Sequence, residues 1–150
     1  MNKTLVFDMD GTIANLYAVE NWLEDLRAYN PRPYIVAKPM YDMEMLNLIL
    51  NELKKDGWKI VVTSWLSKET TFFYDRQVTR AKIEWLKKYN FPCDEIHIVK
   101  YGTKKANCTR KLGGYQILVD DNTEVRNDWN LGSTINANND IITELTMLLA

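Results

Sequence analysis

Hydrophobic positions along the chain alternate between short continuous runs and longer stretches where they recur every three or four residues. The short runs predict buried strands, and they cover residues 4–7, 59–62, 95–99 and 115–119, with a short fifth strand over 133–136. The longer stretches predict helices over 41–56, 75–89 and 140–149, and a short helix over 103–112 that Thr103 could cap. The pattern is clearest in 41–56, where Met43, Leu46, Leu50 and Leu53 share one face.

The order of these elements predicts the fold class. Strands that alternate with helices usually pair in parallel and carry helices on both faces. We therefore expect an α/β three-layer sandwich with a Rossmann-like parallel sheet, formed by residues 1–150 as a single domain. Residues 15–40 lie between the first strand and the first long helix, and they are expected to form a small helical lid. A packed connecting segment with Trp22 and Tyr34 in the core is an equally good interpretation.

Composition narrows the classes of function. The net charge of −1 gives no general basic excess for duplex nucleic acid, although a local basic groove for single strands is compatible with it. Two cysteines, Cys93 and Cys108, are too few for a disulfide framework, so a cytoplasmic location is expected. No apolar run is long enough to span a membrane and no signal peptide is recognisable. The single histidine, His97, excludes a histidine-rich metal site.

Polar residues follow each of the first four predicted strands. Ligands of parallel sheets bind beyond the carboxyl ends of the strands, so these residues are expected to meet. They are Asp8, Asp10 and Gly11 after the first strand, Thr63 and Ser64 after the second, Lys100, Lys104 and Lys105 after the third, and Asp120 and Asp121 after the fourth.

The residue types at these strand ends predict phosphoryl chemistry. Clustered carboxylates need a compensating cation, and an all-oxygen ligand set suits Mg²⁺. A lysine and hydroxyl groups can hold a phosphoryl group, and an aspartate can attack phosphorus to form an acyl phosphate. Gly11 allows the backbone to turn sharply away from the strand. Each element alone is more often a turn, a helix cap or solvated surface; their order and placement together favour the functional interpretation.

The motif Asp8-Met9-Asp10-Gly11-Thr12 directly after an N-terminal strand resembles the first signature of the haloacid-dehalogenase-like hydrolases. Thr63 or Ser64 resembles the second signature, the lysine group the third, and Asp120-Asp121 the fourth. The resemblance extends from the first strand past the fourth. Arg80 to Trp85, with lysine and tryptophan three residues apart, is similar to a helix segment of the 5'(3')-deoxyribonucleotidase branch, although the insert after the first motif is shorter here.

This resemblance implies a role for each residue. Asp8 would be the nucleophile and Asp10 the general acid and base, which is typical of the phosphatase branches. Mg²⁺ would be held by the Asp8 carboxylate, the Asp10 main-chain carbonyl and Asp120, with Asp121 assisting. The hydroxyl that binds the phosphoryl group would be Thr63 or Ser64, and the neutralising lysine Lys104 or Lys105, with Lys105 slightly favoured.

Two further residues are candidates for substrate binding. The resemblance implies that Lys82 binds substrate phosphate, and a solvated helical lysine is an equally good interpretation. Trp65 could stack on a nucleobase, although core packing would explain it as well.

The expected function is therefore Mg²⁺-dependent phosphomonoester hydrolysis through a phospho-aspartate, with nucleoside monophosphates as the first choice of substrate. An alternative substrate is a terminal phosphate on a nucleic acid strand, which the short lid would admit. Alternatives of another class are a phospho-acceptor signalling domain and a binding domain without turnover.

Overall fold

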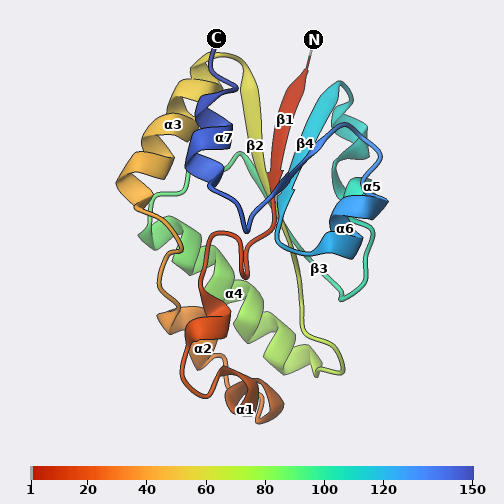
Figure 1. Ribbon diagram of the computed structural model, residues 1–150. Coiled ribbons are helices and arrows are strands. Elements are labelled where there is room, and N and C mark those ends of the chain that lie inside the picture. Colours follow the sequence, from red (N-terminus) through yellow and green to blue (C-terminus); the bar gives the residue numbers. More distant parts are fainter. Residues whose placement is uncertain (1) are drawn as a thin grey trace.

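The five strands form one parallel sheet in the computed structural model, which describes residues 2–150 (Figure 1). Their order across the sheet is β3-β2-β1-β4-β5. The strands are β1 Lys3–Phe7, β2 Trp58–Trp65, β3 Glu95–Val99, β4 Tyr115–Asp120 and β5 Thr134–Asn136. Both the α/β class and the parallel pairing predicted from the sequence are thereby confirmed.

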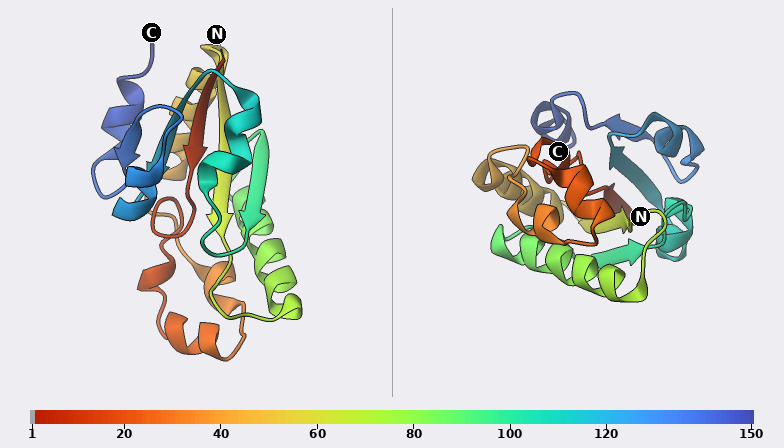
Figure 2. Two further views of the ribbon diagram at one scale, coloured as in Figure 1. Left: turned by 90° about the vertical axis from the view of Figure 1, so that its right-hand side faces the viewer. Right: turned by 90° about the horizontal axis from the view of Figure 1, so that it is seen from below.

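Helices cover both faces of the sheet, as expected (Figure 2). The α-helices are α1 Trp22–Arg27, α2 Arg32–Val36, α3 Met43–Lys55, α4 Phe72–Lys88, α5 Lys105–Thr109, α6 Thr123–Asp128 and α7 Ile141–Thr146, with 3-10 turns η1 Leu16–Ala18 and η2 Arg110–Leu112. None of the helices in the described part of the chain is long and apolar enough to cross a membrane.

Alternate residues of the central strands point to opposite faces, and both faces are apolar. Leu5 and Phe7 of β1 belong to a large core that also contains buried residues of α3, α4 and α7. Val6 belongs to a smaller core on the other face, together with Ala106 of α5 and Trp129 after α6. Because both faces are covered, the strands read as continuous apolar runs rather than as alternating ones.

The order of the strands leaves a reversal point beside β1. The chain first builds β2 and β3 on one side of β1 and then returns to build β4 and β5 on the other. Phe7 is paired with Val62 on one side and with Val119 on the other, so Asp8, Thr63 and Asp120 follow at the same level of the sheet. The Asp8 amide donates to the Val119 carbonyl at 2.9 Å, which fixes Asp8 next to Asp120. Ligands of open α/β sheets bind at such a reversal point.

Some boundaries differ from the predicted ones. The second strand continues through Thr63 and Ser64 to Trp65, so the motif-two hydroxyls lie within β2 and not after it. The predicted helix over 103–112 is divided into α5 and η2, and the Thr103 hydroxyl donates to the Lys100 carbonyl instead of capping α5. Helix α6 was not predicted, because only its Asn122 cap and few apolar positions mark it.

Residues 15–40 form a small helical segment over the carboxyl edge of the sheet, which we call the lid segment (Figure 1). Its two ends are held together where the Asn15 amide donates to the Lys38 carbonyl at 2.8 Å. Tyr34 of α2 is buried against Tyr74 and Val78 of α4. The lid segment is thus anchored on α4 by apolar packing.

Candidate active site

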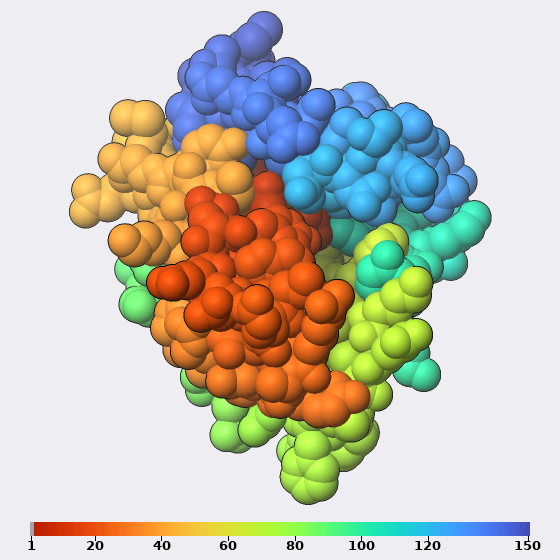
Figure 3. All heavy atoms as spheres, turned by 60° about the horizontal axis from the view of Figure 1, so that its bottom comes forward, coloured from red at the N-terminus to blue at the C-terminus, as the bar shows by residue number. Residues whose placement is uncertain are grey.

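A cleft of about 750 Å³ opens at the carboxyl edge of the sheet, beneath the lid segment. Figure 3 shows the surface hollowed between the lid segment (red to orange) and the loops that follow β2 and β4. Four carboxylates at the ends of β1 and β4 line the cleft together with Ser64 and Lys105, namely Asp8, Asp10, Asp120 and Asp121. Aromatic side chains from the lid segment and from the loops form much of the remaining wall, namely Tyr17, Trp22, Tyr34, Trp65 and Tyr101.

Three carboxylates and one lysine form the centre of the site. Asp8, Asp120 and Asp121 each offer an oxygen within 4.8 Å of the others. The Lys105 ammonium lies 2.8 Å from both Asp8 and Asp120, and its side chain is only 3% exposed. The second oxygen of Asp8 accepts a hydrogen bond of 3.0 Å from the Thr12 hydroxyl. Residues 97 positions apart in the sequence are therefore joined by a buried ion pair.

Negative charge in this cluster exceeds what the lysine offsets. Burial, reinforced by the charge of Asp8, raises the pKa of the Asp121 carboxyl to about 7. Burial and Asp8 also raise the pKa of Asp120, against the opposing effect of Lys105. Burial alone would lower the pKa of Lys105, but its two carboxylate partners raise it, so the lysine stays charged. The cluster is therefore short of positive charge.

The donor set fits a hard divalent cation. Asp8, Asp120 and Asp121 supply oxygen ligands only, the type that Mg²⁺ prefers. Burial and the charge of Asp8 raise the pKa of Asp121, and a cation would offset that charge. That the Asp10 carbonyl is a further ligand stays a prediction.

Asp10 is held by a second buried lysine. The Lys82 ammonium, from α4, donates to the Asp10 carboxylate at 2.9 Å, to the Ser64 hydroxyl at 2.7 Å and to the Trp65 carbonyl at 2.9 Å. An ammonium has three donors, so all of them are used. Lys82 is fully buried and does not line the cleft. It is therefore no solvated helical lysine, and its donors are directed at Asp10 and β2 rather than at the cleft.

Thr63 and Ser64 are neighbours in β2, so their hydroxyls point to opposite faces of the sheet. Ser64 lines the cleft and accepts the hydrogen bond from Lys82. The Thr63 hydroxyl is buried and has no hydrogen-bond partner among the residues that the structure describes. A buried hydroxyl without a partner is rare in folded proteins and needs an explanation. The structure thus leaves Ser64 engaged and Thr63 with a spare donor.

Gly11 and Trp65 occupy the positions that the motifs suggested. Gly11 has a positive φ of 81°, which confirms the sharp turn, and a Cβ there would collide with the Asp121 carboxylate and with Tyr17. The Trp65 indole donates to the Thr103 carbonyl at 2.8 Å and packs against Tyr101, with ring centroids 5.0 Å apart. Trp65 lines the cleft, so it is at the rim rather than in the core.

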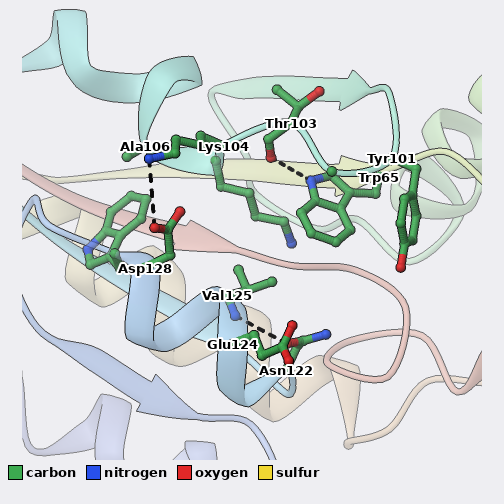
Figure 4. A pocket seen from close by; sticks show the side chains of 12 residues that line it. Trp65, Tyr101, Thr103, Lys104, Ala106, Asn122, Glu124, Val125 and Asp128 are labelled. Atoms are coloured by element: carbon green, nitrogen blue, oxygen red, sulfur yellow. Dashed lines mark hydrogen bonds and ion pairs between the residues drawn. The ribbon is translucent and has the colours of Figure 1, made fainter.

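Only one of the two alternative lysines reaches the cluster. Lys104 instead lies 3.8 Å from Asp128, and its side chain is 66% exposed (Figure 4). Both lysines line a side pocket of about 420 Å³ between α5 and α6, which shares Trp65 and Tyr101 with the cleft. Lys105 therefore belongs to the carboxylate cluster, and Lys104 lies outside it. Lys100 lies outside it as well, on a groove beside α4.

Several residues of the site carried no recognisable signal in the sequence. Tyr17 lies in the 3-10 turn η1 and Tyr101 in the turn after β3, where an isolated aromatic residue indicates nothing about a site. Thr12 could have been singled out, since it completes the first motif and its hydroxyl bonds Asp8.

The sequence of the chain was compared with models of protein families and with curated proteins. No protein-family model matches the chain, and no curated protein matches it either. The residues of the site and the contacts between them are therefore the basis for assigning a function.

Proposed function

We propose that the protein is a Mg²⁺-dependent phosphomonoester hydrolase of the haloacid-dehalogenase-like type, which acts through a phospho-aspartate at Asp8. The observation that supports this most is the contact of Lys105 with both Asp8 and Asp120, at 2.8 Å each, at the reversal point of the sheet. A single aspartate at the end of a strand would not by itself support this function. Here the candidate nucleophile, a buried cation and two further carboxylates share one cleft.

The proposed reaction has two displacements at phosphorus. In the first, an oxygen of Asp8 bonds to phosphorus, the ester P–O bond breaks, and Asp10 gives its proton to the leaving oxygen. In the second, Asp10 takes a proton from a water molecule whose oxygen attacks phosphorus, the Asp8–phosphorus bond breaks, and inorganic phosphate leaves. Lys105 would offset charge on the phosphoryl oxygens and on Asp8 throughout. Bound Mg²⁺ would supply further neutralisation of the phosphoryl charge.

The surroundings of Asp10 support its role as acid and base. Burial raises the pKa of the Asp10 carboxyl above its ordinary value, while Lys82 opposes the shift and Asp8 adds to it. A carboxyl with a raised pKa can hold a proton before the first displacement. Lys82 fixes the direction of this carboxyl through their 2.9 Å contact, so we assign Lys82 a positioning role instead of phosphate binding.

Nucleoside monophosphates are the proposed substrates. The cleft of about 750 Å³ is large enough for a ligand of that size. The Trp65–Tyr101 pair at its rim offers aromatic faces on which a base could stack.

The test is a phosphate-release assay with purified protein and excess Mg²⁺. The panel contains nucleoside monophosphates, sugar phosphates and phosphorylated DNA ends. We expect release from at least one nucleotide, and none when a chelator replaces the metal. Folded protein that releases phosphate from no member would overturn the proposal, and a phospho-protein that persists after treatment with acetyl phosphate would favour a signalling domain instead.

Magnesium is expected to stabilise the folded protein, because it would relieve repulsion among Asp8, Asp120 and Asp121. Binding to the folded state alone adds about 2.7 kcal/mol at a metal concentration one hundred times the dissociation constant. Thermal unfolding with increasing MgCl₂ measures this. NaCl at equal ionic strength is the control, and a melting temperature that responds equally to both salts would contradict a specific site.

The two β2 hydroxyls are expected to respond differently to removal. Thr63→Val deletes a buried hydroxyl without a partner, so stability should be unchanged or higher. If that hydroxyl donates to a phosphoryl oxygen, turnover should fall roughly 10- to 100-fold, since hydrogen bonds to charged groups contribute about 1.5–3 kcal/mol. Ser64→Ala removes a partner of Lys82 and should lower the free energy of unfolding by about 1–3 kcal/mol.

Steady-state kinetics and urea unfolding of both variants separate these effects. Full activity in Thr63→Val would exclude its hydroxyl from phosphate binding. An unchanged unfolding free energy in Ser64→Ala would show that its bond to Lys82 contributes little.

A further inference from the structure

A groove with an aromatic and basic lining continues from the active-site cleft along the outer side of α4. The cleft shares Leu66, Lys68 and Tyr101 with a shallow pocket over the loop between β2 and α4. That pocket shares Leu66 and Lys100 with a larger hollow of about 770 Å³ beside α4. We call these two connected hollows the α4 groove.

The apolar part of the α4 groove is unusual for a solvent-facing helix side. Phe72 and Phe73 are the first two residues of α4, and they are 74% and 81% exposed. The buried side of the same helix faces the lid segment through Tyr74 and Val78. The packing of α4 is therefore complete without the two phenylalanines, so their rings are free to contact a ligand.

Basic side chains accompany these rings. The α4 groove has five basic residues and three acidic ones, although the whole chain has a net charge of −1. The Arg76 guanidinium lies 5.8 Å from the Phe72 ring centre, and the Lys68 ammonium lies 5.7 Å from that of Tyr101. One of the acidic residues, Asp75, lies in the first turn of α4, where the helix dipole favours a carboxylate. It accepts a hydrogen bond from the Thr70 hydroxyl. The groove thus presents two cation–aromatic pairs to an anionic ligand.

We infer that the α4 groove binds a nucleic acid single strand whose terminal phosphate lies in the active-site cleft. A basic groove that also carries exposed aromatic rings is the feature by which proteins bind single strands without sequence preference. Continuity with the cleft determines where the end of the strand would lie. This inference depends on the proposed phosphatase activity for its chemistry, but the groove's binding of a strand can be measured without any turnover.

The experiment combines binding with hydrolysis. Fluorescence anisotropy measures the affinity for a labelled single strand of about ten nucleotides without a terminal phosphate, over a series of salt concentrations. Phosphate release is then compared between the same strand, phosphorylated at its 5' or 3' end, and a nucleoside monophosphate. We expect measurable, salt-dependent binding and a higher kcat/KM for one of the phosphorylated strands than for the mononucleotide.

Variants of the groove identify the surface that is used. Phe72→Ala/Phe73→Ala should weaken strand binding about tenfold or more through lost stacking. Arg76→Gln should weaken binding and reduce its salt dependence. Both variants should leave kcat/KM for the mononucleotide within about twofold, because none of the three residues lines the cleft. Matched controls lie on α3, where Met45→Ala/Leu48→Ala removes two exposed apolar side chains and Lys55→Gln removes one exposed charge.

The outcomes are distinct. Strand binding that the groove variants lose and the α3 variants keep supports the inference. Intact mononucleotide turnover without strand binding overturns the inference and leaves the proposed function standing, whereas strand binding without any phosphate release overturns the proposed function alone. A dimer that Phe72→Ala/Phe73→Ala dissociates, with no affinity for strands, would show that the groove binds a second copy of the chain.

Discussion

Replacement of Asp8 by asparagine is expected to abolish phosphate release, with a loss on the order of 10⁴-fold or more in kcat, the range seen when an enzyme's nucleophile is removed. An amide oxygen is a poor nucleophile toward phosphorus and a weak ligand for Mg²⁺, so both proposed roles of this side chain disappear together. The substituted amide would keep the size of the side chain and could still accept the hydrogen bond from Thr12.

The protein fold is expected to survive this change. The substitution removes the ion pair with Lys105, but it also removes a charge that repels Asp120 and Asp121. Circular dichroism checks the fold, and phosphate release measures the loss. Glu52→Gln is the matched control, since it makes the same carboxylate-to-amide change on the exposed side of α3. Undiminished activity in the Asp8→Asn protein would remove Asp8 from the proposed role.

Replacement of Lys105 by methionine is expected to lower both stability and activity severely. The Lys105 ammonium is the shared partner of Asp8 and Asp120, and its side chain is almost completely buried. Removal of one partner from a buried ion pair costs about 3–5 kcal/mol, because the remaining charge stays desolvated and unpaired. Turnover should also be lost, since no other ammonium lies within ion-pair distance of Asp8 in the described part of the chain.

Lys104→Met provides a control at the adjacent position. Lys104 is exposed and its ion pair with Asp128 spans 3.8 Å, so the free energy of unfolding should change by less than about 0.5 kcal/mol. Urea unfolding of the two variants measures the contrast, and added Mg²⁺ should restore part of the stability lost in Lys105→Met. Equal effects of the two substitutions would contradict the buried ion pair.

The local signals in the sequence were sufficient for the class of fold. Helix α3 illustrates this, because its apolar residues recur at helical spacing and the Asp42 carboxylate caps its first turn by accepting hydrogen bonds from the Glu44 and Met45 amides. The end of β2 was predicted too early, since Thr63, Ser64 and Trp65 look like residues after a strand although their backbone pairs with β3. Strand length depends on the neighbouring strand, and that information is not local.

Part of the candidate site could also be predicted from local signals in the sequence. Asp8, Asp10, Gly11 and Asp121 follow strands, Asp120 is the last residue of β4, and the parallel topology brings strand ends to one edge. The choice between Lys104 and Lys105 was not readable, because adjacent residues at the start of a helix point in different directions, which depend on how α5 packs on the sheet. The contact between Lys82 and Asp10 joins residues 72 positions apart, and no local pattern records it.

The sequence by itself therefore determined the succession of strands and long helices, the covered faces of the sheet and the set of chemical groups at its edge. It did so because hydrophobic periodicity and strand-end placement are properties of short segments. Only the tertiary structure decided which lysine joins Asp8 to Asp120, that Lys82 holds Asp10, and that the phenylalanines at the start of α4 border a groove leading to the cleft. These are contacts between distant segments, and their geometry is fixed by packing across the whole core.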